Sequence, residues 1–109
     1  MKNQKKCLLQ AHRGVSTDYP ENTMSAFHGA LLQGYDIIEM DVRFTSDNRC
    51  IILHDRTVNR TGRYADGTEI PEKTEISSLT FEQVRELDFG KWFAPEFAGE
   101  KIPALEEVL

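Results

Sequence analysis

The sequence predicts an α/β fold with parallel strands, and two stretches carry that prediction. Residues 7–11 form a short apolar run that ends at "HRG", where glycine marks the start of a loop. Residues 35–44, "YDIIEMDVRF", are rich in the β-branched and aromatic side chains typical of a strand. Residues 7–42 together have the length of a βαβ unit, so we expect the two strands to pair in parallel.

A helix is expected between these two strands, shortly after Pro20. Asn22 or Thr23 can cap its first turn by accepting hydrogen bonds from free backbone N–H groups. Gly34 is suited to end it, because glycine readily adopts the left-handed conformation found after a helix. The apolar stripe of this predicted helix consists of Met24, Phe27 and Leu31.

A third strand is predicted over residues 50–54, which run into "HD". Two connections to it are compatible with the sequence. A two-residue Asp47-Asn48 turn would make a hairpin, and in that register Asp41 lies opposite His54. A crossover without a helix would make the third strand parallel, with both residues at the same rim of the sheet. Either connection predicts that Asp41 and His54 lie close together.

The remaining chain is less regular. Residues 56–78 are polar and rich in glycine and threonine, and a loop of this length in a compact domain usually carries function or is disordered. A short helix is predicted after Thr80, with Gln83 as its capping-box partner. Residues 88–102 are aromatic and irregular, and residues 103–109 begin another apolar stripe with Leu105, Val108 and Leu109.

Composition excludes several classes of function. The chain has 109 residues, enough for one domain, and 18 acidic against 13 basic residues give a net charge of −5. Without a basic block, we expect no nucleic-acid binding and no attraction to anionic membranes. No apolar segment is long enough for a signal peptide or a membrane span. Cys7 and Cys50 are expected to be buried free thiols, which fits a cytoplasmic protein.

Glu39 and Asp41 form the first candidate site. They lie two residues apart on a predicted strand, so their side chains share one face. Two neighbouring carboxylates repel unless a cation or several donors lie between them. Calcium and magnesium prefer such oxygen ligands. The alternative is an exposed strand edge, on which these carboxylates form a salt bridge with Arg13 or Arg43.

His12 and His54 favour the catalytic interpretation, because each follows a different predicted strand and has a charged neighbour. Strand ends at one rim are where α/β folds assemble their active sites. One imidazole can take a proton from a nucleophile while the other protonates a leaving alkoxide. Arg13 can hold a phosphate through its forked donors. The residues therefore predict attack on a phosphodiester.

The motifs "HRG", "PENT", "IEMD" and "ILHD", at the spacings found here, resemble the glycerophosphodiester phosphodiesterase family over residues 8–59. Residues 90–109 are similar to that family's segment after a small insertion. The resemblance implies a TIM barrel of the phosphodiesterase type, of which this chain would hold the N-terminal portion. It implies hydrolysis of small glycerophosphodiesters to sn-glycerol 3-phosphate and an alcohol.

The resemblance also implies a role for each candidate residue. His12 and His54 would form the acid/base pair, Arg13 would contact phosphate, and Glu39 with Asp41 would hold Ca²⁺ or Mg²⁺. Trp92 and Phe93 are candidate wall residues at the glycerol end of the site. Glu21 and Asn22 match "ENT", for which capping or a scaffold role is the alternative to substrate contact.

The implied layout is a single partial domain over residues 1–109. Barrel strands 1–3 and the first helix would occupy residues 7–55, the family insertion and the aromatic loop residues 56–102, and the start of the next helix residues 103–109. A full barrel needs about 250 residues. A further glutamate ligand is expected beyond Leu109, so we expect the chain to be part of a longer gene product.

Two alternative functions follow from the same residues. A truncated, non-catalytic fragment would keep residual phosphate or cation binding, and if 109 residues were the complete protein, it would be inactive and would self-associate. A barrel that cleaves phosphoinositides or sphingomyelin would also use paired histidines and an acidic metal site. The combination of "HRG", "PENT" and "HD" favours the glycerophosphodiester interpretation.

Overall fold

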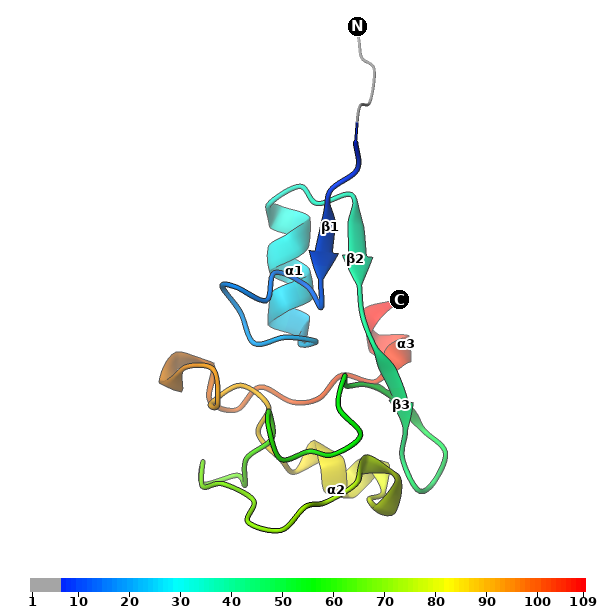
Figure 1. The fold of residues 1–109 in the computed structure, drawn as a ribbon, viewed down its shortest axis with the longest axis vertical. Helices are drawn as coiled ribbons and strands as arrows, with labels where there is room; N and C mark the ends of the chain where they lie inside the picture. Colours follow the sequence, from blue (N-terminus) through cyan, green and yellow to red (C-terminus); the bar gives the residue numbers. More distant parts are fainter. Residues whose placement is uncertain (1–6) are drawn as a thin grey trace, which may run out of the picture.

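The computed structural model describes residues 7–109, and its N-terminal part is a βαβ unit (Figure 1). Strand β1 (Gln10–His12) pairs in parallel with β2 (Ile37–Glu39), and helix α1 (Met24–Leu32) lies beside the pair. The register sets His12 opposite Glu39 at the end of both strands. The predicted parallel pair is therefore confirmed, and it brings two candidate site residues together.

Helix α1 begins after Thr23, whose hydroxyl accepts a hydrogen bond from the backbone N–H of Ala26 at 3.2 Å. The predicted apolar stripe is wrong at two of its three positions, because Met24 and Leu31 are 42% and 67% exposed. Small side chains let the helix approach the strands and Tyr19 closely. The buried face consists of Ala26, Phe27, Gly29 and Ala30.

The second pair of strands is an antiparallel hairpin of β3 (Val42–Phe44) and β4 (Cys50–Ile52), which is the first of the two predicted connections. Its loop has three residues rather than two, because Thr45 donates its backbone N–H to the carbonyl of Arg49 at 3.0 Å. Only Asn48 adopts the left-handed conformation, with φ 66°. A two-residue hairpin loop usually needs positive φ at one or both of its residues. In this three-residue loop a single residue, Asn48, has positive φ.

The extra loop residue shifts the predicted hairpin register. Leu53, not His54, lies opposite Asp41 and donates its backbone N–H to the Asp41 carbonyl at 2.9 Å. His54 nevertheless stays next to β3, because the Arg43 side chain donates from Nε and Nη2 to its carbonyl oxygen at 3.1 and 2.6 Å. The predicted pairing of Asp41 with His54 is wrong by one residue.

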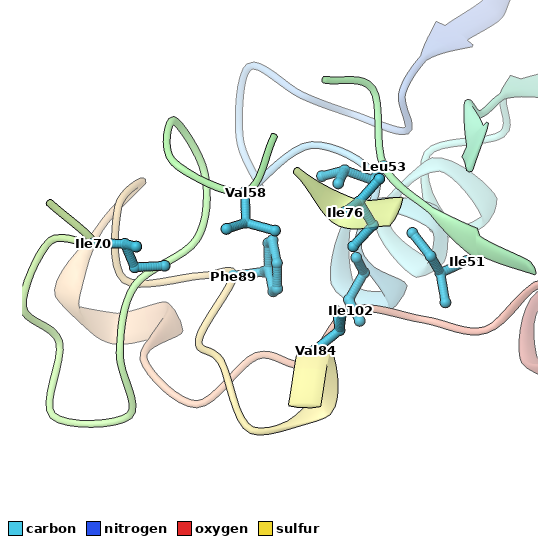
Figure 2. Close-up of a cluster of buried hydrophobic side chains, with 8 residues drawn as sticks. All are labelled: Ile51, Leu53, Val58, Ile70, Ile76, Val84, Phe89 and Ile102. Atoms are coloured by element: carbon cyan, nitrogen blue, oxygen red, sulfur yellow. The ribbon is translucent and has the colours of Figure 1, made fainter. Parts of the chain in front are cut away.

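A hydrophobic core includes Ile51 of β4 and is otherwise built by residues that follow the hairpin (Figure 2). The segment 56–78, predicted from its polarity as an excursion, contributes three of the buried side chains. Four short elements follow the hairpin: η1 (Ile76–Ser78), α2 (Phe81–Arg85), η2 (Pro95–Phe97) and α3 (Leu105–Val108). Of these, η1 and α2 each contribute a side chain to the core. The buried side chains are Ile51, Leu53, Val58, Ile70, Ile76, Val84, Phe89 and Ile102.

Helix α2 begins as the sequence predicts. The Thr80 hydroxyl accepts from the backbone N–H of Gln83 at 3.2 Å, and the Gln83 side chain accepts from the Thr80 N–H at 2.9 Å. Both cysteines are free thiols, but Cys7 is exposed and Cys50 only partly buried, so the expected burial is wrong for Cys7. Among residues 7–109, no helix has the length and apolarity needed to cross a membrane.

Contacts of Ser25 and Tyr19 join the βαβ unit to the aromatic segment near the end of the chain. Ser25, in the first turn of α1, donates its hydroxyl to the Glu100 carboxylate at 2.8 Å. The rings of Tyr19 and Phe97 meet edge to face, with centroids 5.7 Å apart. These contacts bring the loop after β1 close to the segment that carries Trp92.

Candidate functional site

The first site residues lie where β1 ends. His12 is its last residue, and Arg13 follows in the left-handed conformation, with φ 58°. Asn22 also has a positive φ, 56°, and its backbone N–H donates to the Arg13 carbonyl at 2.9 Å. Left-handed backbone is uncommon at residues other than glycine, and asparagine tolerates it better than arginine does, so the strained position here is Arg13. The two ends of this loop are therefore held together at the candidate site.

Both carboxylates predicted to bind metal face Arg13. Glu39 Oε1 accepts the Arg13 backbone N–H at 3.0 Å and lies 3.8 Å from Nε2 of His12. Asp41 Oδ2 lies 3.5 Å from Nε of Arg13 and accepts the Asn22 side-chain amide at 3.1 Å. The salt bridge to Arg13 that the sequence allowed is thus present, but it is half-buried at the end of the parallel pair rather than on an exposed strand edge.

These two carboxylates also fit a hard cation. The contacts of their side chains within residues 7–109 use Oε1 of Glu39 and Oδ2 of Asp41, which leaves Oε2 and Oδ1 for another ligand. Calcium and magnesium take such carboxylate oxygens and complete their shell with water and substrate oxygens. The described residues contain no group of three or more His, Cys, Asp or Glu side chains placed to hold a metal. Within the described residues, Glu39 and Asp41 therefore remain candidate ligands only.

Glu21 connects the Arg13 side of the site to the opposite side. Its side chain is only 10% exposed, and both of its oxygens accept from Nη1 of Arg13, at 3.3 and 3.4 Å. Arg60, from the loop after β4, donates Nη1 and Nη2 to the same two oxygens at 3.1 and 2.7 Å. A nearly buried carboxylate needs such partners, because burial without them strongly disfavours its charge.

His54 is held by the adjacent Asp55. Its Nδ1 lies 2.8 Å from Asp55 Oδ1, and Arg60 donates Nε to Asp55 Oδ2, also at 2.8 Å. Hydrogen bonds from Arg60 and His54 lower the pKa of Asp55 from 3.8 to about 2. Asp55 is therefore a carboxylate at neutral pH and can only accept, so neutral His54 carries its proton on Nδ1 and leaves Nε2 free.

The contacts form one connected group that includes all five residues named from the sequence. Glu39 links His12 to Arg13, Arg13 also contacts Asp41, and Glu21, Arg60 and Asp55 complete the connection from Arg13 to His54. The sequence did not identify Arg60 or Asp55 as members of this group. The "HD" pair was a signal for Asp55, whereas Arg60 lies in a polar loop that carried no signal.

Trp92 lies at the border of this group. The guanidinium of Arg60 is 5.8 Å from the centroid of its ring, and Phe93 meets the same ring edge to face at 5.7 Å. The Trp92 indole Nε1 is buried and has no hydrogen-bond partner among the described residues. The two predicted wall residues thus adjoin Arg60, while His28 is exposed on α1, outside the connected group.

The Asp55 contacts predict a measurable loss of stability in acid. Because the folded-state pKa is lowered from 3.8 to about 2, stabilisation is full above pH 4 and is lost as the pH falls to 2. We expect Asp55 to contribute about 1–2 kcal/mol, since its partners are partly exposed. The free energies of unfolding of the wild type and of Asp55→Asn, measured with urea, should differ by this amount at pH 6 and become equal near pH 2. A difference that does not change with pH would contradict the assignment.

Comparison with known proteins places this geometry in a family. The model of the glycerophosphoryl diester phosphodiesterase family matches residues 12–109. The chain belongs to this family. This family member spans about two fifths of the length of its relatives from Bacillus subtilis, Caldanaerobacter subterraneus and Bacillus altitudinis. The curated glycerophosphodiester phosphodiesterase of Caldanaerobacter subterraneus is 43% identical over 103 residues, which are 94% of this chain and 39% of the relative.

Other members of the family show the same partial coverage. Human glycerophosphodiester phosphodiesterase 1 is 42% identical over 101 residues, which are 91% of this chain and 28% of the human protein. The crystal structure of the glycerophosphodiester phosphodiesterase from Agrobacterium tumefaciens superposes with a TM-score of 0.82 at 32% identity, covering 94% of this chain and 41% of that one.

An Oleispira antarctica phosphodiesterase, solved in complex with the product sn-glycerol-3-phosphate, also superposes with a TM-score of 0.82 at 32% identity. The match covers 94% of this chain and 38% of that structure. The fold is therefore that of the N-terminal portion of a TIM barrel, as predicted, and residues 7–109 form no closed barrel by themselves.

Proposed function

We propose that this protein contributes the catalytic rim of a metal-dependent glycerophosphodiester phosphodiesterase, which hydrolyses its substrate to sn-glycerol 3-phosphate and an alcohol. The observation that carries the proposal is the connected group of two imidazoles, a guanidinium and two carboxylates at the ends of β1, β2 and β4. Family membership and the product complex of the Oleispira relative support the choice of substrate.

The two histidines divide the proton transfers. His54 donates Nδ1–H to Asp55, so its free Nε2 is suited to take a proton from the attacking water molecule. The water oxygen bonds to phosphorus as the bond between phosphorus and the oxygen of the leaving alcohol breaks. His12, whose Nε2 lies 3.8 Å from Oε1 of Glu39 at the end of the parallel strand pair, is suited to give its proton to the leaving alkoxide. A phosphoinositide- or sphingomyelin-cleaving enzyme could use the same transfers, and the family match favours the glycerol substrate.

Arg13, together with a cation held by Glu39 and Asp41, would offset the negative charge of the phosphate. Arg13 has its backbone fixed by Glu39 and Asn22, so its guanidinium is positioned before substrate binds. Glu39 and Asp41 would hold Ca²⁺ or Mg²⁺, which supplies positive charge beside the phosphoryl oxygens. In this proposal residues 7–55 hold barrel strands 1–3 and the first helix, residues 56–102 hold the insertion and the aromatic loop with Trp92 and Phe93 at the glycerol end, and residues 103–109 begin the next helix.

The proposal predicts hydrolysis that depends on these groups. The chain is incubated with glycerophosphocholine and Ca²⁺ or Mg²⁺, and released sn-glycerol 3-phosphate is measured. We expect His12→Ala and Glu39→Gln each to lower the rate at least about 100-fold, because each removes a group that acts in the transition state. EDTA should have an effect as large as Glu39→Gln. The exposed His28→Ala is the matched control and should keep the wild-type rate.

A second candidate function rests on the partial length of the chain and on its having, within residues 7–109, only two candidate metal ligands, Glu39 and Asp41. A non-catalytic piece would bind sn-glycerol 3-phosphate in the presence of Ca²⁺ but release no product from glycerophosphocholine. Isothermal titration of the wild type and of Arg13→Gln distinguishes the two functions. Binding that needs Arg13, without any turnover, would favour the fragment, whereas activity that survives both His12→Ala and Glu39→Gln would refute the proposed mechanism.

A further inference from the structure

Arg60 makes an unusual set of contacts for a residue of a polar loop. Its guanidinium donates Nε and Nη2 to the two oxygens of Asp55, at 2.8 and 3.1 Å. It also donates Nη1 and Nη2 to the two oxygens of Glu21, at 3.1 and 2.7 Å. The planar fork of arginine matches two carboxylates in this way, whereas the single ammonium of lysine cannot.

Each of these carboxylates in turn holds one residue of the candidate site. Asp55 accepts from Nδ1 of His54, and Glu21 accepts from Nη1 of Arg13. Within residues 7–109, the hydrogen bonds and ion pairs of Arg60 go to Asp55 and Glu21 rather than to His54 or Arg13, and its side chain is 44% exposed beside the Trp92 ring. Its contacts therefore act on the site through the two carboxylates.

Acidic and basic side chains alternate along this connection, from Asp55 through Arg60 and Glu21 to Arg13. Arg60 therefore affects both His54 and Arg13. Paired with Arg60, Asp55 stays in the orientation in which it receives the His54 Nδ1–H. Paired with Arg60, Glu21 is already compensated, so Arg13 keeps positive charge available for a phosphate. Without Arg60, Asp55 would be free to rotate away from the imidazole, and Glu21 would depend on Arg13 alone.

We propose that Arg60 is a positioning residue that fixes the tautomer of His54 through Asp55 and the guanidinium of Arg13 through Glu21. Its importance for catalysis rests on the proposed function. Its effect on the two side chains does not, because it can be measured without substrate or turnover.

The test is ¹⁵N NMR of the histidine and arginine side chains in the full 109-residue chain, at a pH where His54 is neutral. In the wild type we expect a single His54 form with the proton on Nδ1 and one sharp Arg13 Nε signal. Arg60→Gln should convert His54 to a mixture of tautomers and shift or broaden the Arg13 signal. Arg60→Lys, which keeps the charge but loses the fork, should restore only part of both signals.

Matched variants separate positioning from general damage. Arg49 has the same 44% side-chain exposure and an ion pair with Glu106, away from the site, so Arg49→Gln should leave both signals unchanged. Asp55→Asn should alter His54 alone, and Glu21→Gln should alter Arg13 alone. If Arg60→Gln does not fold, the Arg60→Lys spectrum, compared with these two variants, decides the question.

The possible outcomes are distinct. Signals in the Arg60 variants that match those of Arg49→Gln would overturn the proposal, and a change in only His54 or only Arg13 would overturn the dual role. If the tautomer effect is present but no hydrolysis is detected, the positioning inference stands and the proposed function fails. If hydrolysis occurs with unchanged tautomers, the positioning inference fails and the proposed function stands.

Discussion

Asp88→Ala is expected to lower the free energy of unfolding by about 3–5 kcal/mol, because it leaves several backbone donors without a partner. Asp88 is 4% exposed and accepts three backbone hydrogen bonds, from Gly90 at 2.8 Å, Lys91 at 3.0 Å and Gly99 at 2.8 Å. Burial raises the pKa of Asp88, but these three donors outweigh it and keep the pKa below its ordinary value. Urea unfolding at neutral pH measures the loss.

Asp66→Ala provides the matched control for this prediction. Asp66 also accepts from a nearby backbone N–H and from a hydroxyl, both of Thr68, but it is exposed. Water can replace the lost carboxylate there, so the cost should stay within about 1 kcal/mol. Equal losses in the two variants would show that the buried donors around Asp88 do not dominate the stability of this segment.

Gly14→Ala is the second large effect, with an expected loss of about 2–5 kcal/mol. Gly14 has φ 81°, a conformation that costs a residue with a side chain about 1–2 kcal/mol. An added Cβ would also lie 2.6 Å from the Cβ of Ala26 and 2.8 Å from its backbone carbon. Helix α1 would have to shift, and such overpacking costs about 1–3 kcal/mol more. The midpoint and slope of urea unfolding give the total loss in free energy of unfolding.

Gly34→Ala separates the two causes of this loss. Gly34 has nearly the same φ, 79°, but an added Cβ would meet no atom within 4 Å. Its substitution should therefore cost only the backbone strain of about 1–2 kcal/mol. If Gly34→Ala destabilised the chain as much as Gly14→Ala, close packing of the loop against α1 would not be the reason for glycine at position 14.

Local patterns were sufficient to predict the start of α2 and the βαβ unit. Thr80 and Gln83 cap α2 as predicted, because a capping box depends only on residues three apart. The βαβ unit followed from strand composition and spacing in the same way. The hairpin register did not, because one residue more in the loop after Thr45 changes every partner along both strands.

The candidate site was likewise predicted only in part. The five residues named from motifs do lie in one connected group, because the ends of neighbouring strands bring them to one rim. Arg60 could not be found this way, since it belongs to a polar loop outside the motifs and reaches Glu21 only through the fold. Which faces of α1 are buried was equally out of reach, because exposed Leu31 and buried Ala30 are distinguished only by what packs against the helix.

The position of Trp92 gives this protein an internal optical reporter. It is the single tryptophan of the chain, and its ring lies 5.8 Å from the Arg60 guanidinium at the border of the candidate site. Indole emission responds to nearby charge and to solvent, so ultraviolet fluorescence observes this border without any label. Movement of the Arg60 side chain on ligand addition would be followed in real time, and the same signal would record unfolding of the aromatic segment.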